Sequence, residues 1–595
     1  MQRFFTFHKI KVPGRKKITH QLLSPKNCDP CELRFKNNFS SSQPRLMAKT
    51  TLHAGPIVDR NNVFKSPFDD VEIPSGYIHQ YVWKDVHRWW NKTALVCAVS
   101  GRSYSYKKLR RLCGRFAISL RRNNLRPGDT LAVVLPNIPE YAIVALGASE
   151  AGVKVTLLNP AYTAHEMSIQ IVNSEAAAVI TIQKNYPVIV ESIKGKNSVR
   201  LPAIVVASGS EPVPTGAINF RDLIADGIDE FEKIGEQTGI DDKKDTVVLP
   251  YSSGTTGLPK GVELTHRNII ANIVQNEHPE YNTDEPAFGE HQEIIPVFLP
   301  FYHIYGFVVC LHYYLRLGGK IICMPQFTPN NLLDILEKNK TSALYVAPPI
   351  VQLMTNDDRF NKKHVECVKI FLSGAAPLGT ELVAKFQAKM KHSINQGYGL
   401  TETSPMVSRS KYSAAESVGL ISVNSRIRIV CGNDDKFGHN LGLNEMGEIF
   451  VKGPQVMTGY FKNVKATEDC MDGEWFKTGD LGHIDEKGQL FISGRRKELI
   501  KVKGLQVSPA ELEDLIFGHE KVADVAVIGV PHERLGEAPK AFIVSKPNSK
   551  ITEEEIKNYV AERLSKHKHI DQVQFIDKIP KSPAGKILRK ELQKL

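Results

Sequence analysis

Short apolar runs alternate along most of the chain with segments that carry a helical pattern. The runs include LAVVLP, KVTLLNP, AAAVIT, PAIVVAS, EIIPVFLP, KIICMP and ALYVAPP. Helical segments follow the first two, from about Tyr141 to Ala151 and near His165. This repetition predicts an α/β fold with parallel sheets covered by helices. The length of 595 residues predicts more than one domain.

The alternation ends at LFISGRRKELIKVKG, where Gly494 and a basic cluster interrupt it. A short segment with helix-start signals follows, which predicts a small and separate α+β domain. We therefore expect a basic extension over 1–50, a large multi-sheet domain over 51–493, a hinge over 494–504 and a small mobile domain over 505–595.

Two capping boxes are predicted in the small domain. Ser508 stands three residues before Glu511 in SPAELEDLI, and Thr552 stands three before Glu555 in ITEEEI. In such a box the hydroxyl and the carboxylate satisfy each other's backbone N–H groups at the helix start.

The net charge of +13 comes mostly from the first 50 residues, which hold 11 Lys and Arg against two acids. The basicity is thus an end effect, which argues against a nucleic-acid partner. A Ser-, Arg- and Lys-rich start that is poor in acids is typical of a mitochondrial presequence, with a solvated tail as the alternative. The final Gln593-Lys594-Leu595 partly matches a peroxisomal signal, and a cytosolic location stays open. No apolar run approaches the ~18 residues of a membrane span.

The stretch YSSGTTGLPKGVELTH, from Tyr251 to His266, concentrates Gly, Ser and Thr around Lys260. Backbone N–H groups and hydroxyls in such a loop can all point at one anion. It is no Walker A loop, because Gly261 stands where the Mg²⁺-binding hydroxyl is needed. We expect a strand, a polyphosphate-binding loop and a helix, with a mobile surface loop as the alternative.

Further motifs place chemistry-bearing residues after Gly-rich turns. In QGYGLTETSP a carboxylate, Glu402, could hold Mg²⁺. In WFKTGDLGHID, Asp480 is suited to bind two ribose hydroxyls. SGAAPLG could lie against a flat base, FYHIYG sets His303 among aromatics, and KSPAGKILRKEL presents Lys586. Taken singly, each has a structural explanation, such as a turn cap or a core histidine.

Together and in this order, the motifs resemble the adenylate-forming superfamily, which includes acyl-CoA synthetases, 4-coumarate–CoA ligases and beetle luciferases. The resemblance covers roughly residues 70–595. It implies an AMP-forming acid–CoA ligase that uses ATP, Mg²⁺ and CoA, with a carboxylic acid as its other small-molecule partner. It does not indicate the oligomeric state.

The resemblance also implies a role for each motif residue. Cofactor-binding positions are Ser252, Ser253, Gly254, Thr255, Thr256 and Lys260 for the β- and γ-phosphates, Ala375, Gln396 and Gly397 for adenine, and Asp480 and Arg495 for the ribose. Glu402 would bind Mg²⁺, and Thr401 would contact the α-phosphate. Lys586 would bridge the acyl carboxylate and the α-phosphate.

A second half-reaction is implied, in which the small domain turns and the acyl group passes to CoA. Lys497 would mark the hinge, and Lys501, Lys503 and Gly504 would then face CoA. A side chain at Gly504 would obstruct a narrow pantetheine tunnel. Lys586, Lys501, Thr401 and His303 are thus the expected catalytic residues.

The acid itself is less well specified. His303, Tyr305 and Gly397 would border the acyl pocket, and an aromatic lining accepts either a phenylpropenoid ring or an alkyl chain. Because GEIF carries Phe450 where plant coumarate ligases have cysteine, we expect a medium- or long-chain fatty acid, with an aromatic acid as the alternative.

Three different activities are also compatible with the fold that the resemblance implies. One is a luciferase-like oxidation of the adenylate, which shares every motif with the ligases. The second is a domain that loads a carrier protein, and the third is a catalytically silent binding protein. The presence of every expected charged residue argues against the last two.

Overall fold

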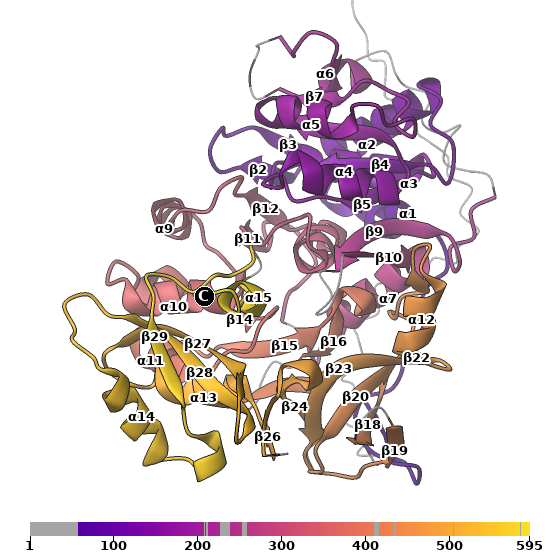
Figure 1. The fold of residues 1–595 in the computed structure, drawn as a ribbon. Helices are drawn as coiled ribbons and strands as arrows, with labels where there is room; N and C mark the ends of the chain where they lie inside the picture. The colour runs from indigo at the N-terminus through magenta and orange to yellow at the C-terminus, as the bar shows by residue number, and fades with distance from the viewer. Residues whose placement is uncertain are drawn as a thin grey trace, which may run out of the picture. The chain divides into compact units, whose positions relative to one another are not determined.

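The computed structural model describes residues 57–595, except 208, 210–211, 226–238, 253–258, 282, 410–413, 415, 434–435, 504 and 584. The predicted extension over 1–50 and the phosphate-loop residues 253–256 therefore lie outside the described residues, as does Gly504. Within the described residues the strands form four sheets (Figure 1).

An eight-stranded sheet carries the first half of the predicted alternation. Its strands, in spatial order, are β21 (Gly459–Tyr460), β10 (Lys260–Thr265), β9 (Thr246–Ser252), β5 (Lys154–Leu157), β4 (Thr130–Val134), β6 (Ala176–Ile182), β7 (Ile204–Val206) and β8 (Ile218–Asn219). From β9 to β8 all neighbours run parallel, as predicted.

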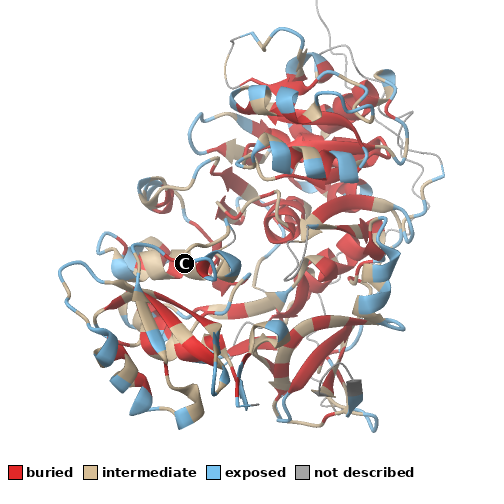
Figure 2. Ribbon diagram, in the orientation of Figure 1, coloured by how far each residue is buried: buried red, intermediate tan, exposed pale blue. Residues whose placement is uncertain are grey.

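Helices cover both faces of this sheet, which explains why its strands are apolar throughout. Leu131 and Val133 of β4 belong to a core shared with α2 (Tyr106–Arg122) and α3 (Glu140–Glu150). The alternate residues Ala132 and Val134 belong to a second core on the other face. That face is covered by α4 (Ala164–Asn173) and α5 (Tyr186–Ile193). Figure 2 shows the sheet buried and the outer faces of its helices exposed.

A twelve-stranded sheet forms the second layer. Its path is β1 (Val63–Lys65), β18 (Arg426–Asn433), β20 (Gly447–Lys452), β23 (Trp475–Ile484), β24 (Gln489–Arg495), β17 (Ser417–Ile421), β16 (Met406–Arg409), β15 (Asn395–Gly399), β14 (Ile370–Ser373) and β13 (Ala343–Val346), with β19 (Lys436–Asn440) beside β18 and β22 (Met471–Asp472) beside β23. Among the described strands of this sheet, only β13, β14 and β15 run parallel to one another.

The antiparallel part of this sheet departs from the predicted parallel order. Buried and half-buried residues alternate along the whole of β23, which is the pattern of a strand with one covered face. Such strands can be joined by tight turns and need no crossover helix. A smaller sheet of β11 (Ile294–Val297), β12 (Lys320–Cys323), β2 (Thr93–Cys97) and β3 (Ser103–Ser105) completes the large domain.

The other helical segments of the large domain are mostly short. They are α1 (Ile78–Trp83), η1 (Val86–Trp89), η2 (Gln183–Asn185), α6 (Phe220–Leu223), α7 (His266–Glu277), η4 (Tyr305–His312), α8 (Tyr313–Leu317), α9 (Pro329–Lys338), α10 (Pro348–Asn356), η5 (Lys362–Val365), α11 (Thr380–Met390), η6 (Thr401–Thr403) and α12 (Val464–Cys470). Among the described residues, no helix combines the length and the apolar character that crossing a membrane requires.

The small C-terminal domain has its own sheet and core, so the α/β fold with a large multi-sheet domain and a small α+β domain is confirmed. Its elements are η7 (Arg496–Glu498), β25 (Ile500–Val502), β26 (Leu505–Val507), α13 (Pro509–Phe517), β27 (Val522–His532), β28 (Gly536–Ser545), α14 (Glu553–Ala561), η8 (Lys566–Lys568), β29 (Gln572–Phe575) and α15 (Arg589–Leu592). The core joins Ile500, Leu512 and Val560 across three elements. The segment 494–504, predicted as the hinge, spans the end of β24, then η7 and β25.

Two local predictions are wrong. A strand, β10, stands between the predicted phosphate loop and helix α7, and it pairs antiparallel with β9 through Lys260 opposite Ser252. Strands β9 and β10 therefore form an antiparallel pair before α7 begins.

The capping boxes are the second error. The Ser508 hydroxyl donates to the Ser493 carbonyl at 2.5 Å and caps nothing. Thr552 does accept from the Glu555 N–H at 3.2 Å. The Glu555 carboxylate, however, binds Lys521 at 2.7 Å and does not complete a box.

Candidate active site

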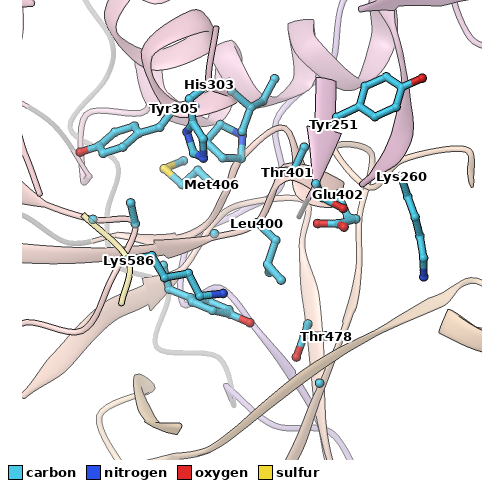
Figure 3. Close-up of a pocket in the computed structure, with 18 of the residues that line it drawn as sticks. Tyr251, Lys260, His303, Tyr305, Leu400, Thr401, Glu402, Met406, Thr478 and Lys586 are labelled. Atoms are coloured by element: carbon cyan, nitrogen blue, oxygen red, sulfur yellow. The ribbon is translucent and has the colours of Figure 1, made fainter. Parts of the chain in front are cut away.

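One cavity of about 700 Å³ brings most of the predicted site residues together (Figure 3). Its walls come from the ends of β9, β10 and β15, the turn after β14, the segment before η4, strand β23, the β24–η7 junction and a turn just before α15. The predicted residues that line it are Ser252, Lys260, His303, Tyr305, Ala375, Gly397, Thr401, Glu402, Arg495, Lys497 and Lys586. They come from both the large and the small domain.

At one side of the cavity, Lys260 and Glu402 both contact Tyr460. The Lys260 ammonium is 4.8 Å from the centre of the Tyr460 ring, and the Tyr460 hydroxyl donates to Glu402 Oε1 at 3.0 Å. A cation over an aromatic face is stabilised by the ring quadrupole. This side of the cavity therefore carries one cation and one carboxylate, as a metal-bound polyphosphate requires.

The donor set around Glu402 fits Mg²⁺ held largely by phosphate oxygens. Mg²⁺ is commonly bound through one or two carboxylates plus substrate phosphates and water. Glu402 is one such carboxylate, and among the described residues there is no cluster of three or more His, Cys, Asp or Glu side chains that could hold a metal ion by themselves. Glu402 would thus hold Mg²⁺ together with the nucleotide, and the ion would offset the charge of the departing pyrophosphate.

A buried carboxylate, Asp480, stands behind Arg495 at another side of the cavity. The two residues pair across β23 and β24, with Arg495 Nε 3.1 Å from Asp480 Oδ1. The Tyr398 hydroxyl donates to the other oxygen, Oδ2, at 2.7 Å. Burial raises the pKa of Asp480, while Arg495 and the Tyr398 hydrogen bond oppose that rise. A carboxylate held by two fixed donors is a rigid acceptor for vicinal hydroxyls.

Lys586 enters the cavity from the small domain on a turn. Its N–H donates to Ser582 Oγ at 3.1 Å, and its carbonyl accepts from the Ser582 N–H at 2.8 Å. Three residues later, Arg589 anchors the turn through Glu498 at 2.9 Å and Glu513 at 2.5 Å. Burial, and then the nearby Arg495 charge, lower the pKa of Lys586. Figure 3 shows its ammonium extended into the cavity.

Of the three residues predicted to bind adenine, two line the cavity and the third is buried behind the turn. Ala375 lines the cavity with a left-handed φ of 72°, which exposes the backbone of the turn after β14. Gly397 also lines the cavity. Gln396 does not, because its side chain is buried and exchanges two hydrogen bonds of 3.1 Å with the backbone of Leu378. Gln396 therefore holds the turn in place from behind.

His303 and Tyr305 face the cavity from the start of the π-helical segment η4. A Cβ at Gly306 would lie 2.2 Å from the Pro300 carbonyl oxygen, so only glycine allows this close packing. His303 Nδ1 accepts from the Tyr305 N–H at 3.3 Å. Burial lowers the pKa of His303 to about 4, so the ring is neutral at neutral pH and offers no positive charge to the acid.

Lys501 and Lys503, like Gln396 and Asp480, are predicted site residues that do not line the cavity. Lys501 is exposed on β25, where its N–H donates to Glu537 at 2.7 Å, and Lys503 follows the same strand. The structure thus places Lys586 at the cavity and Lys501 away from it.

Sequence reasoning missed several lining residues. Tyr398, Tyr460 and Arg409 line the cavity, and none of them was assigned a role from its sequence context. Of these three, only Arg409 could have been noticed in the sequence. It is a charged residue at the end of the otherwise uncharged run SPMVSR, which forms a buried strand.

Comparison with known proteins agrees with this geometry. The family model described as AMP-binding enzyme matches residues 82–461, and the model described as AMP-binding enzyme C-terminal domain matches residues 511–586. The chain belongs to the AMP-binding enzymes of the adenylate-forming superfamily. Among its relatives, 4-coumarate–CoA ligase 1 from Arabidopsis thaliana is 35% identical over 544 residues, covering 89% of this chain and 95% of the relative. A 4-coumarate–CoA ligase 3 from Oryza sativa subsp. japonica is 35% identical, covering 89% and 94%.

Solved structures of this superfamily share the fold. ATP-bound MatB from Rhodopseudomonas palustris superposes with a TM-score of 0.77 at 27% identity, covering 87% of this chain and 98% of MatB. A benzoate CoA ligase from Burkholderia xenovorans LB400, at 24% identity and a TM-score of 0.76, shows the same fold. The chain is an AMP-forming acid–CoA ligase that works through an acyl-adenylate, and its co-substrates are ATP with Mg²⁺ and CoA.

Proposed function

We propose that the acid activated by this ligase is a compact aromatic carboxylic acid. The observation that carries the proposal is the aromatic side of the cavity, where the lining residue Tyr305 packs edge-on against Tyr345 with ring centres 6.3 Å apart. His303 and Met406 complete this side (Figure 3). The cavity of about 700 Å³ must also hold the nucleotide, which favours a short, flat acid. The names of the curated relatives, 4-coumarate–CoA ligases, support the same choice.

In the first half-reaction the acid carboxylate attacks the α-phosphate of ATP and pyrophosphate leaves. Two anions must approach each other, so a cation between them lowers the barrier. Lys586 is the cation that reaches the cavity on a fixed turn. Asp480 and Arg495 would hold the ribose, and Lys260 would stabilise the departing phosphates. The neutral His303 would border the acid without pairing with it.

In the second half-reaction the CoA thiol attacks the acyl carbonyl and AMP leaves. We propose that the small domain turns about the segment 494–504 between the two steps, with Lys497 at the pivot. That turn would carry Lys586 out and bring Lys501 and Lys503 toward CoA. If the small domain turns in this way, Lys501 should lie outside the cavity during adenylate formation. Its exposed position on β25 agrees with that expectation.

Pyrophosphate release against a panel of acids, with and without CoA, tests the substrate proposal. We expect kcat/KM to be highest for phenylpropenoates and benzoates and lower for alkanoates of eight to sixteen carbons. The fatty-acid preference predicted from the sequence stays a prediction. A higher kcat/KM for the alkanoates than for the aromatic acids would support that preference and overturn the aromatic proposal. Oxygen uptake in the same assay tests the luciferase-like alternative.

We propose a mitochondrial location on the strength of the basic, acid-poor segment 1–50. Residues 1–50 fused to a fluorescent reporter should enter mitochondria. A diffuse signal would contradict this proposal, and a peroxisomal signal lost on deletion of Gln593-Lys594-Leu595 from the full chain would favour the alternative.

A further inference from the structure

The acyl end of the cavity has a polar floor that the reaction does not explain. Ser408 and Arg409 of β16 and Asn276 of α7 line the cavity beyond Tyr305. Arg409 is 1% exposed and Asn276 is fully buried. A pocket for an alkyl chain would be expected to end in apolar side chains, because a polar group buried against a hydrocarbon loses its hydrogen bonds.

Arg409 has donors that its described neighbours leave unused. Its Nη1 donates to Asn276 Oδ1 at 3.0 Å, and its Nη2 donates to the Tyr345 hydroxyl at 3.3 Å. A guanidinium carries five N–H donors. Its Nε has no hydrogen-bond partner among the described residues. A buried donor without a partner is costly. A ligand oxygen that reached the guanidinium from the cavity would reduce that cost.

The charge of Arg409 is already balanced through the hydroxyl that it contacts. The Tyr345 hydroxyl donates to Asp284 Oδ2 at 3.2 Å, and the same oxygen accepts from Tyr314 at 2.8 Å and from Tyr313 at 3.3 Å. Arg409 and Asp284 thus form one positive and one negative end of a short relay. A second carboxylate on the acid would leave the floor with an excess negative charge, whereas a neutral oxygen would not.

From this arrangement we infer that Arg409 is a specificity-determining residue that selects acids carrying a neutral hydrogen-bond acceptor, such as a hydroxyl or carbonyl oxygen, at the end far from the reacting carboxylate. The inference rests on the proposed function for the shape of the acid, and it adds the chemistry of its far end. Tyr345 is a positioning residue, since its hydroxyl contacts the guanidinium and its ring packs edge-on against Tyr305.

The test compares acids that differ by one distal oxygen. Pyrophosphate release without CoA is measured for cinnamate against 4-hydroxycinnamate, and for octanoate against 8-hydroxyoctanoate. We expect the wild type to prefer the hydroxylated member by about 10- to 100-fold in kcat/KM, the range for a hydrogen bond to a charged group. Arg409→Met keeps an unbranched apolar stem but removes the guanidinium and all its donors, and it should reduce that ratio to near one. Hexanedioate should be a poor substrate for the wild type.

Controls separate specificity from folding. Arg316→Met removes a partly buried arginine, which pairs with Asp85 and Glu277 and does not line the cavity, so the ratio should stay at the wild-type value. If Arg409→Met does not fold, Tyr345→Phe should still lower the ratio, because it removes the hydroxyl that orients the guanidinium. A wild-type ratio near one in both pairs, or a ratio that survives in both variants, would overturn the inference. If the octanoate pair were better substrates than the cinnamate pair, and the preference for the hydroxylated acid still required Arg409, only the aromatic proposal would be overturned.

Discussion

Lys586 lines the cavity and belongs to the small domain. Among the described residues, no other predicted catalytic cation of that domain does so. Its position depends on the turn from Ser582 and on the double anchor of Arg589. We expect Lys586→Ala to slow acyl-adenylate formation by about 100-fold or more, because it removes preorganised charge from between two anions. Thioester formation from a synthetic acyl-adenylate and CoA should largely persist. Equal losses in the two assays would mean that Lys586 serves both steps.

The lowered pKa of Lys586 gives a pH prediction with a definite sign. The cation is the active form, and its loss as pH rises should end activity. Because the folded protein depresses the pKa below the ordinary 10.5, the alkaline limb of kcat/KM for pyrophosphate release should fall below pH 10.5. Lys586→Arg should retain a smaller activity that lacks this limb, since a guanidinium stays protonated. A limb shared by both proteins would assign the titration to another group.

The residues that could be predicted from sequence are those that sit in motifs. Lys260 and Glu402 belong to stretches whose composition indicates their chemistry, and both line the cavity. Asp480 follows such a turn too, and it is bound to the lining residue Arg495. The contacts of Tyr398 and Tyr460 with Asp480 and Glu402 could not be predicted, because they join strands far apart in the chain. Such contacts depend on sheet register, which no local pattern specifies.

At the scale of elements, the buried parallel strands were the most predictable part. Every apolar run named from the sequence is a strand, from β4 to β13, because burial on both faces leaves an uninterrupted apolar signal. Strand β10 was missed because KGVELT carries a charged residue at Glu263 and begins inside a loop-like motif. The antiparallel half of the large sheet was missed for a similar reason, since its strands have one half-buried face.

The cap of α14 allows a prediction about the small domain alone. Thr552 accepts from the Glu555 N–H, and no described capping box supplements that bond. Thr552→Ala should lower the free energy of unfolding by about 1 kcal/mol. Thr552→Ser, which keeps the hydroxyl, should cost less, and urea titration of both variants measures the difference. Equal stabilities for the Ala and Ser variants would show that the cap contributes nothing.

At the scale of the whole enzyme, a few polar contacts hold the small domain against the large one. Asp514 of α13 accepts from the Thr380 hydroxyl at 2.9 Å and from its N–H at 3.3 Å, at the start of α11. We expect Asp514→Ala to lower acyl-adenylate formation several-fold, because it weakens the arrangement that places Lys586 in the cavity. Transfer from a synthetic acyl-adenylate to CoA should not fall. A loss confined to the transfer step would contradict this assignment.

Lys501 provides a second test of the proposal that the small domain turns between the two half-reactions. It is exposed on β25 while Lys586 lines the cavity, so a fixed enzyme could use only one of them. We expect Lys501→Ala to leave acyl-adenylate formation nearly intact and to slow transfer to CoA by about tenfold or more, the effect of one lost charge-assisted contact. A residue used in one half-reaction should affect that half alone. Trapping acyl-adenylate without CoA, then adding CoA, measures both rates. Lys557→Ala, at a partly exposed lysine paired with Glu553 on α14, is the control and should change neither rate. If Lys501→Ala impaired adenylation as severely as Lys586→Ala, both lysines would have to act in one state, and the small domain would not need to turn.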